Sequence, residues 1–294
     1  MRPDCVIYAF SDYEGPSRRL AAAAGIRFEM VGLHRFPDGE SRVKIPVPVA
    51  RHVIICRTLN QPNNKLVELL LAAETARERG AERLTLVAPY LCYMRQDVAF
   101  SPGEAVSQRV VGRLLAAGFD EVVTVDPHLH RIHRLDEVMP GARCIVATAT
   151  GLMGEYISRH LDSPLLLGPD AESAQWVRQI ADAHGFESGV GAKERRGDRL
   201  VSYSIPDVRC HGRNVVLVDD VASTGYTLTA AASEIRKRQP ASITVFVVHP
   251  LFVDGALRRV LENGVKQVWS ADTIVDSTNV IQLADVLATA VTQR

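Results

Sequence analysis

Residues 215–227 read VVLVDDVASTGYT, and this stretch decides the fold that the sequence predicts. Four apolar residues run into Asp219 and Asp220, and a short segment, 221–225, leads into the helical pattern TLTAAASEIRKRQ. An apolar run that ends in polar residues and turns into a helix is typical of a buried strand in an open α/β sheet. Such sheets bind ligands beyond the carboxyl ends of their strands. We therefore expect a ligand site at this turn.

The turn is chemically suited to a pentose phosphate. The first N–H groups of a helix have no partner within the helix and lie at the positive end of its dipole, so they bind phosphate. Ser223, Thr224 and Thr227 add hydroxyl donors. Asp219 and Asp220 suit sugar hydroxyls or Mg²⁺. The alternative is a capped helix without a ligand, but a cap needs one acid rather than two.

The same alternation of short apolar runs and helical periods extends outward over the chain. Expected strands are 52–59, 83–91, 121–126, 164–170, 214–220 and 242–250, and expected helices are 63–80, 104–119, 151–161, 173–185 and 227–239. All-apolar strands separated by helices indicate parallel sheets covered on both faces. The sequence therefore predicts two α/β domains, 1–145 and 146–294, although no sequence repeat is obvious. Residues 189–207 predict a hairpin-like, partly mobile excursion.

Composition narrows the class of protein. The 294 residues contain 34 basic and 34 acidic side chains, so the overall charge gives no support to a nucleic-acid partner. Five widely spaced cysteines are expected to be free thiols in a reducing compartment. We expect no signal peptide, and no apolar run approaches the roughly 20 residues of a membrane span. These features predict a cytoplasmic protein.

Residues 219–227 resemble the phosphoribosyl-diphosphate fingerprint of the type I phosphoribosyltransferase fold. The resemblance implies two tandem domains of this fold, each a mainly parallel sheet flanked by helices. It also implies a set of ribose 5-phosphate ligands: Asp219, Asp220, Ser223, Thr224, Gly225, Tyr226 and Thr227. Tyr226 stands where many relatives have a second glycine, and the backbone there must accept a side chain.

Two further stretches are similar to motifs of ribose-phosphate pyrophosphokinases. RFPDGES (35–41) resembles a motif whose aromatic ring stacks on adenine, and VAPYLCYMRQD (87–97) resembles a segment that binds ATP. The ATP ligands implied by this resemblance are Phe36, Asp38, Glu40, Arg95, Gln96 and Asp97. By itself the first stretch is only a turn, and the second could be a surface charge pair. FSPGEAVSQ (100–108) resembles the archaeal-type branch of the family.

Two more strand ends supply the metal ligands that the resemblance implies. TVDPHLH (124–130) places His128 where the family has a histidine near magnesium and ATP, and LLLGPDAES (165–173) places Asp170 near metal and ribose. The family usually continues with glycines where this chain has Glu172 and Ser173. The histidines at 128, 130 and 133 could instead suggest zinc, but they lack the i, i+4 helical pair and a cysteine partner.

AKERR (192–196) matches the mobile loop of the family, which carries a lysine and then an arginine two residues later. Lys193 and Arg195 are the matching residues, and the resemblance makes them catalytic within a mobile loop at 190–203. Taken without the other motifs, this segment is a solvated charge run.

The motifs follow the order of the family from residue 35 to 227 and imply transfer of diphosphate from ATP to the anomeric hydroxyl of ribose 5-phosphate, with Mg²⁺. The chain has no Walker-type phosphate loop. The family resemblance further implies a homo-oligomer with the ATP site near a subunit interface. The alternatives are a catalytically weak regulatory homologue and a phosphoribosyltransferase. An RNA-binding relative on the same fold lacks support from the composition.

Overall fold

The structure is a computed structural model that describes residues 4–129, 131–196 and 200–293, with the side chains of 193–203 left out. The chain forms two compact units. The first contains Met1–Thr148, Thr273–Val275 and Gln282–Arg294, and the second contains Ala149–Asp272 and Asp276–Ile281.

The first unit is built on a six-stranded parallel sheet in the order β2-β1-β5-β6-β7-β8. Its strands are β1 (Cys5–Ala9), β2 (Arg27–Met30), β5 (His52–Cys56), β6 (Arg83–Val87), β7 (Glu121–Val125) and β8 (Arg143–Ala147). Its helices are α1 (Glu14–Ala24), α2 (Pro62–Glu78), α3 (Ser107–Gly118) and α8 (Ala284–Thr292), with short 3₁₀ turns η1 (Ser11–Tyr13) and η2 (Leu135–Glu137).

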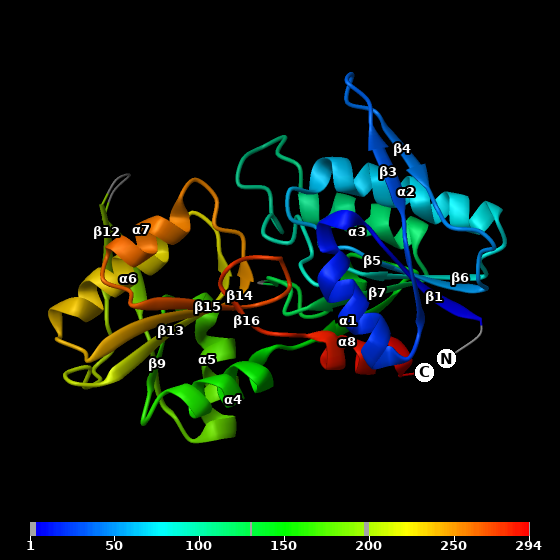
Figure 1. Ribbon diagram of the computed structural model, residues 1–294. Coiled ribbons are helices and arrows are strands. Elements are labelled where there is room, and N and C mark those ends of the chain that lie inside the picture. The colour runs from blue at the N-terminus through cyan, green and yellow to red at the C-terminus, as the bar shows by residue number, and fades with distance from the viewer. Residues whose placement is uncertain (1–3, 130, 197–199, 294) are drawn as a thin grey trace. The chain divides into compact units, whose positions relative to one another are not determined.

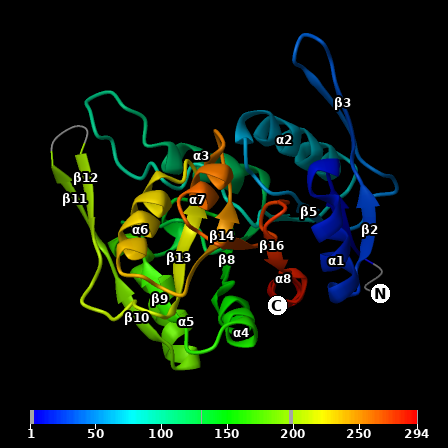
Figure 2. The same ribbon diagram turned by 60° about the vertical axis from the view of Figure 1, so that its left-hand side comes forward.

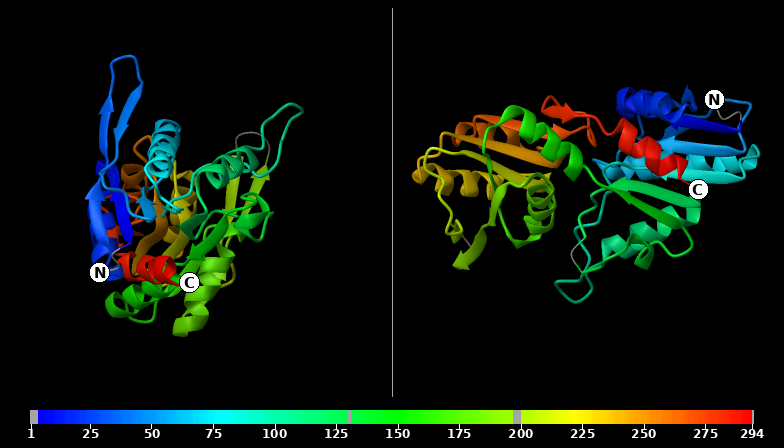
Figure 3. Two further views of the ribbon diagram at one scale, coloured as in Figure 1. Left: turned by 90° about the vertical axis from the view of Figure 1, so that its right-hand side faces the viewer. Right: turned by 90° about the horizontal axis from the view of Figure 1, so that it is seen from below.

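Helices cover both faces of this sheet, as the apolar strands require. Helices α1 and α8 pack together on one face, and α2 and α3 lie on the other (Figure 1). Alternate strand residues point to the α2 and α3 side and form a buried core with these helices, including Val6, Tyr8, Val53, Ile55, Leu84, Leu86, Leu69 and Leu115. The C-terminal helix α8 lies beside α1 in the view from below in Figure 3.

The second unit repeats the architecture of the first. Its parallel sheet has the order β10-β9-β13-β14-β15-β16. The strands are β9 (Leu165–Gly168), β10 (Glu187–Val190), β13 (Asn214–Ala222), β14 (Ser242–Pro250), β15 (Gln267–Ala271) and β16 (Asn279–Ile281). The helices are α4 (Thr150–His160), α5 (Ala174–His184), α6 (Tyr226–Lys237) and α7 (Ala256–Glu262), and η3 (Ala171–Ser173) precedes α5.

Comparison of the two strand orders matches β9 with β1, β13 with β5 and β14 with β6. Helices α6 and α7 pack on the core face of the second sheet, and α4 and α5 pack together on the opposite face (Figure 2). The duplication of architecture predicted from the sequence is therefore present, although the two halves share no obvious sequence repeat.

Each unit also carries a two-stranded antiparallel hairpin between its second and third sheet strands. In the first unit it is β3 (Gly32–Arg35) with β4 (Ser41–Lys44), and in the second it is β11 (Ala192–Arg196) with β12 (Leu200–Ser204). The second hairpin confirms the predicted excursion, whose mobility stays a prediction. The sequence does not signal the first hairpin, because residues 26–34 have the apolar character of one strand, whereas β2 and β3 belong to different sheets.

The predicted boundary at 145/146 differs from the division of the structure at the C-terminus. Helix α8 packs against α1, β7 and β8, so 282–294 belong to the first unit rather than to a domain of 146–294. The reason is packing: Leu287, Ala288 and Val291 of α8 are buried. Among the helices of the described residues, none is long and apolar enough to cross a membrane.

Candidate active site

The turn between β13 and α6 is the centre of the predicted sugar-phosphate site. Strand β13 pairs with β9 and β14 and delivers Asp219 and Asp220 to its carboxyl end. Gly225 is the N-cap of α6 with φ 75°, a backbone conformation that side chains rarely adopt. A Cβ at this position would lie 3.1 Å from Val260 Cγ2. Both backbone conformation and space therefore require glycine here.

The start of α6 can receive an anion. No side chain caps the helix, and the first amides of a helix have no intrahelical acceptor. Thr224 and Tyr226 are exposed, while Ser223 and Thr227 are half-buried. The structure thus brings together all seven residues predicted to bind ribose 5-phosphate on one strand end and one turn.

The acids of this site carry like charges close together. Asp219 is half-buried and Asp220 is 3% exposed, and the Asp220 amide donates to Asp219 Oδ1 at 3.0 Å. Burial raises the pKa of Asp219 well above its ordinary value, and the negative charges of Asp220 and Asp170 raise it further. A cation or a hydroxyl donor would relieve this repulsion.

Asp170 follows β9 and lies within electrostatic reach of Asp219. Its Oδ1 accepts from the amides of Glu172 at 3.1 Å and Ser173 at 3.4 Å, so the carboxylate caps η3. Ser173 is buried and donates its hydroxyl to the Asp170 carbonyl at 2.6 Å. Glu172 and Ser173 therefore form a packed capping turn that holds Asp170 in place.

The predicted catalytic pair lies on the hairpin of the second unit. The backbone of Lys193 pairs with Tyr203 and that of Arg195 pairs with Val201. The side chains of Lys193 and Arg195 lie outside the described residues, as does part of the predicted loop 190–203.

The predicted adenine-binding residues gather at the tip of the β3–β4 hairpin, which projects from the sheet of the first unit (Figure 1). The Phe36 amide donates to the Glu40 carbonyl at 2.8 Å, and the Glu40 amide donates to Asp38 Oδ1 at 3.1 Å. Phe36 is 39% exposed, with the His34 ring edge-on at 4.7 Å. This tip presents an aromatic ring beside two exposed carboxylates.

The segment after β6 places Arg95, Gln96 and Asp97 in different environments. Arg95 is exposed, and Gln96 Nε2 donates to Glu104 Oε1 at 2.9 Å. The Asp97 side chain is 1% exposed and accepts from Arg131 Nη1 at 2.6 Å. Arg95 is therefore the member of this group that is exposed to solvent, and Asp97 instead holds Arg131, a residue that the sequence motifs did not single out.

His128 follows β7 in the first unit and is half-buried, whereas Asp170 lies in the second unit. Within the described part of the chain, no group of three or more His, Cys, Asp or Glu side chains could hold a metal ion. His130, one member of the possible zinc cluster, lies outside that part. An ion held by few protein ligands, such as Mg²⁺ with its own water, remains compatible with Asp170.

Arg259 of α7 is a further contact of the turn, and no sequence motif signals it. Its Nη1 donates to the Thr224 carbonyl at 2.5 Å and its Nη2 donates to the Asp254 carbonyl at 3.1 Å. Its guanidinium also lies 4.5 Å from the centre of the Tyr226 ring. Arg259 thus contacts both the backbone of the turn and the Tyr226 side chain.

Comparison with known proteins agrees with this geometry. Residues 5–118 match the family described as the N-terminal domain of ribose phosphate pyrophosphokinase, and residues 145–283 match the phosphoribosyl transferase domain. A ribose-phosphate pyrophosphokinase of Methanothermobacter thermautotrophicus is 34% identical, with 92% of this chain and 96% of the relative covered. Another from Thermococcus kodakarensis is 35% identical, with 81% and 83% covered.

A solved structure shares the whole architecture. The crystal structure of phosphoribosylpyrophosphate synthetase from Mycobacterium smegmatis has a TM-score of 0.83 and 22% identity, and the match covers 97% of each chain. The likeness to this structure supports the two-unit fold, and the sequence matches identify the relatives. The chain belongs to the ribose-phosphate pyrophosphokinase family.

Proposed function

We propose that the chain performs the reaction of its family with the residues described above: diphosphate moves from ATP to the anomeric hydroxyl of ribose 5-phosphate. The observation that carries the assignment is the β13–α6 turn. There a strand ends in Asp219 and Asp220, and a helix starts at a left-handed Gly225 without a side-chain cap. This arrangement offers acceptors for a diol and donors for a phosphate within one turn.

Ribose 5-phosphate would bind with its phosphate against the first amides of α6. The hydroxyls of Ser223, Thr224 and Thr227 would donate to the remaining phosphate oxygens. Asp219 and Asp220 would accept from the ribose hydroxyls, which replaces repulsion between carboxylates with hydrogen bonds. Tyr226 would lie at the rim, held by Arg259.

ATP would bind to the first unit and to a hairpin tip. Phe36 would stack on adenine, Asp38 and Glu40 would contact the base, and Arg95 would bind phosphate oxygens with its planar fork. Gln96 and Asp97 complete the proposed ATP set, with Asp97 acting through Arg131. We also propose a homo-oligomer in which the hairpin tip lies near a subunit interface, because an exposed aromatic ring on a projecting hairpin suits contact with a neighbouring chain.

Mg²⁺ fits the donor set of this site. Asp170, near the acids of β13, offers carboxylate oxygen, the ligand type that Mg²⁺ prefers, and His128 stays a predicted metal contact. The ion would supply charge neutralisation on the phosphate oxygens of ATP.

The chemical step is a displacement at phosphorus. The oxygen of the anomeric hydroxyl bonds to the β-phosphorus, the bond from that phosphorus to the bridging oxygen of the α-phosphate breaks, and AMP leaves. The hydroxyl proton passes to solvent. Lys193 and Arg195 would stabilise charge on the transferred group, and closure of their hairpin would exclude water. Loss of one such donor commonly lowers turnover by about 10²–10³.

We place this reaction in the cytoplasm. All five cysteines are described and none forms a disulfide, which fits a reducing compartment. Burial raises the pKa of Cys92 to about 12, so this thiol is unreactive at neutral pH.

The test is the product balance. Purified protein with Mg²⁺, ATP and ribose 5-phosphate should form AMP and phosphoribosyl diphosphate in equal amounts, without a nucleobase. Lys193→Ala should lower both rates by about 10²–10³. ATP binding without AMP formation would contradict the activity. Full activity of Lys193→Ala would contradict the catalytic role of Lys193 but would leave the proposed reaction standing.

A further inference from the structure

The first unit contains a polar pocket of about 560 Å³ that the proposed reaction does not use. Residues of the β5–α2 turn and the start of α2 form most of its wall: Thr58, Asn60, Gln61, Pro62, Asn63, Asn64 and Lys65. Asp12, Arg35, Ile274 and Val275 complete it, and all of these belong to the first unit. The volume is that of a small-molecule site.

This pocket lies at the position of the first unit that corresponds to the ribose 5-phosphate turn of the second. Strand β5 occupies the same place in its sheet as β13, and each leads into a helix, α2 or α6. Both helices begin after a residue with left-handed backbone, Gln61 at φ 51° and Gly225 at φ 75°. Neither N-cap forms a side-chain cap. The amide donors of α6 begin at its first residue, whereas α2 begins with Pro62, which has no N–H, so the donors of α2 begin at Asn63.

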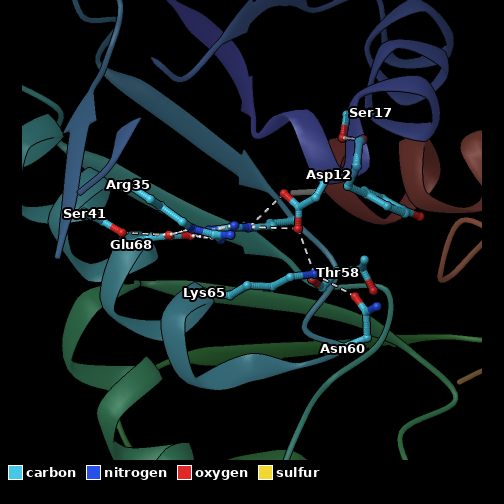
Figure 4. Close-up of polar contacts among 10 residues, drawn as sticks. Asp12, Ser17, Arg35, Ser41, Thr58, Asn60, Lys65 and Glu68 are labelled. Atoms are coloured by element: carbon cyan, nitrogen blue, oxygen red, sulfur yellow. Dashed lines mark hydrogen bonds and ion pairs between the residues drawn. The ribbon is translucent and has the colours of Figure 1, made fainter. Parts of the chain in front are cut away.

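A network of ionised side chains supports the pocket (Figure 4). Lys65 Nζ donates to the Thr58 carbonyl at 2.9 Å and to Asn60 Oδ1 at 2.7 Å, and it pairs with Asp12 at 2.7 Å. All three N–H donors of the Lys65 ammonium group are thereby used, and these contacts hold the β5–α2 turn in one conformation. The turn is therefore held in shape by the protein before any ligand binds.

The network has more positive than negative charge. Arg57, with 1% of its side chain exposed, pairs with Asp12 at 3.1 Å and with Glu68 at 2.7 Å. Arg35 pairs with the same Glu68 at 2.9 Å. Three cations therefore face two carboxylates, which leaves one excess positive charge beside the positive end of α2.

Two buried donors of the turn have no hydrogen-bond partner among the described residues: Arg57 Nη1 and Thr58 Oγ1. Thr58 is 1% exposed and lines the pocket. Buried polar groups are nearly always hydrogen-bonded, so the Thr58 hydroxyl in the wall of the pocket calls for a partner such as a ligand or a water molecule. The amide side chains of Asn60, Asn63 and Asn64 add groups that can bind hydroxyls.

We propose that this pocket is a second anion site, which binds the phosphomonoester of a small hydroxyl-bearing metabolite such as a sugar phosphate or a nucleotide. The phosphate lies against the backbone amides of Asn63 and Asn64 beside Arg35, and the hydroxyls contact the amide side chains. Ile274 and Val275 form the apolar wall. The duplication of the fold thus leaves two phosphate-binding turns in one chain, one for the substrate and one for a second ligand.

The test is amide hydrogen exchange of the full-length protein with inorganic phosphate, ribose 5-phosphate or ADP, each at matched ionic strength with sodium chloride as reference. A ligand at ten times its Kd should slow exchange of residues 60–66 about tenfold. Protection by inorganic phosphate alone would assign the anchor to the phosphate group, and protection by only the larger probes would show that the hydroxyls are needed. Protection of 223–229 without 60–66 would overturn the second site and leave the reaction unaffected.

A charge variant makes the test specific. Asn64→Asp adds a negative charge to the pocket at the third position of α2, where an acid stabilises the helix, so the protein should stay folded. The variant should weaken binding at 60–66 by about tenfold or more through repulsion. Leu71→Asp adds the same charge two turns further along α2, outside the pocket, and should keep the protection. Equal protection in wild type and Asn64→Asp would also overturn the proposal.

Discussion

The β5–α2 turn of the first unit and the β13–α6 turn of the second unit are built on the same backbone plan but carry opposite electrostatics. Each follows the third strand of its unit's duplicated plan and starts a helix after a left-handed residue. In the first turn, carboxylates face cations of the protein. In the second, Asp219 faces the carboxylates of Asp220 and Asp170. The comparison shows that the charges of one fold element can be balanced by the protein's own side chains or left for a ligand to balance.

The pKa values of Glu68 in the first unit and Asp219 in the second unit shift in opposite directions. Burial alone would raise the pKa of Glu68, yet hydrogen bonds from Arg35, Arg57 and Ser41 bring it below its ordinary value. Burial and neighbouring acids raise the pKa of Asp219. The ionised form of Glu68 therefore stabilises the first unit, whereas the ionised form of Asp219 destabilises the second unit until a cation or a hydroxyl donor binds.

The largest effect should follow from breaking the network of the first unit. Glu68→Ala removes the fully buried one of the two carboxylates that pair with the buried Arg57, so the free energy of unfolding should fall by about 3–5 kcal/mol. Urea unfolding measures this loss. Glu74→Ala, an exposed acid on the same helix, is the control and should change stability by less than about 0.5 kcal/mol. An equal loss in both variants would contradict the structural role of the network.

The second prediction concerns the backbone of the second turn. Gly225→Ala places a Cβ 3.1 Å from Val260 at a positive φ, so the turn must shift, and kcat/KM for ribose 5-phosphate should fall by about 10². Steady-state kinetics measure it. Gly212 has φ 71°, but a Cβ there would have no atom within 4 Å. Gly212→Ala should therefore lower the stability of the protein and leave kcat/KM unchanged. Similar kinetic losses in both variants would show that strain alone, not crowding at the site, causes the effect.

The contrast between the units also predicts a pH dependence of stability. Because the folded pKa of Glu68 lies below its unfolded value, its contribution is present above that value and is lost as pH falls through the folded pKa. Stability should therefore decline below about pH 4. Urea titrations from pH 3 to 6 should show a shallower decline in Glu68→Gln. An unchanged slope in this variant would assign the acid lability to other carboxylates.

Asp219→Asn should have opposite effects on stability and activity. Removing the charge relieves repulsion from Asp220 and Asp170, so the thermal midpoint of the protein without ligand should rise, by an amount equivalent to about 1 kcal/mol. Loss of the acceptor should lower kcat/KM for ribose 5-phosphate. Calorimetry and kinetics on the same preparation measure both. A variant that is less stable than wild type would contradict the like-charge account.

The smallest effect is expected at Arg259. Arg259→Met removes its bond to the Thr224 carbonyl and its contact with the Tyr226 ring while keeping much of its volume. KM for ribose 5-phosphate should rise about fivefold, since such contacts contribute about 1 kcal/mol. Tyr226→Gly removes the ring and so separates the two contacts. If Arg259→Met raises KM equally in both backgrounds, the carbonyl bond carries the effect.

Much of the fold could be predicted from the sequence because its signals are local. The apolar runs before Asp219 and around Ile54 indicate buried parallel strands, and the turn at Gly225 indicates the helix start. The hairpin of β3 and β4 and the position of α8 could not be predicted, because antiparallel pairing and packing of α8 on α1 depend on contacts between distant residues. The start of α3 was predicted three residues early because Glu104 bonds the amides of the preceding loop.

The candidate site was likewise predictable only where its signals are local in the sequence. Motifs located the strand ends and turns that hold the proposed ligands, and the structure brings the seven residues of the β13–α6 turn together. The Asp97–Arg131 pair, the Arg259 contact and the network around Lys65 join residues far apart in the sequence, and no spacing pattern signals them. Side-chain partners therefore had to come from the structure.

The central claim is that Asp220 and the β13–α6 turn bind ribose 5-phosphate for transfer of diphosphate. The most direct measurement is the rate of AMP and phosphoribosyl diphosphate formation against ribose 5-phosphate concentration for wild type, Asp220→Asn and the exposed control Asp182→Asn. We predict equimolar products in wild type and the control, and a fall in kcat/KM of about 10² or more in Asp220→Asn. Wild-type kinetics in Asp220→Asn would contradict the account.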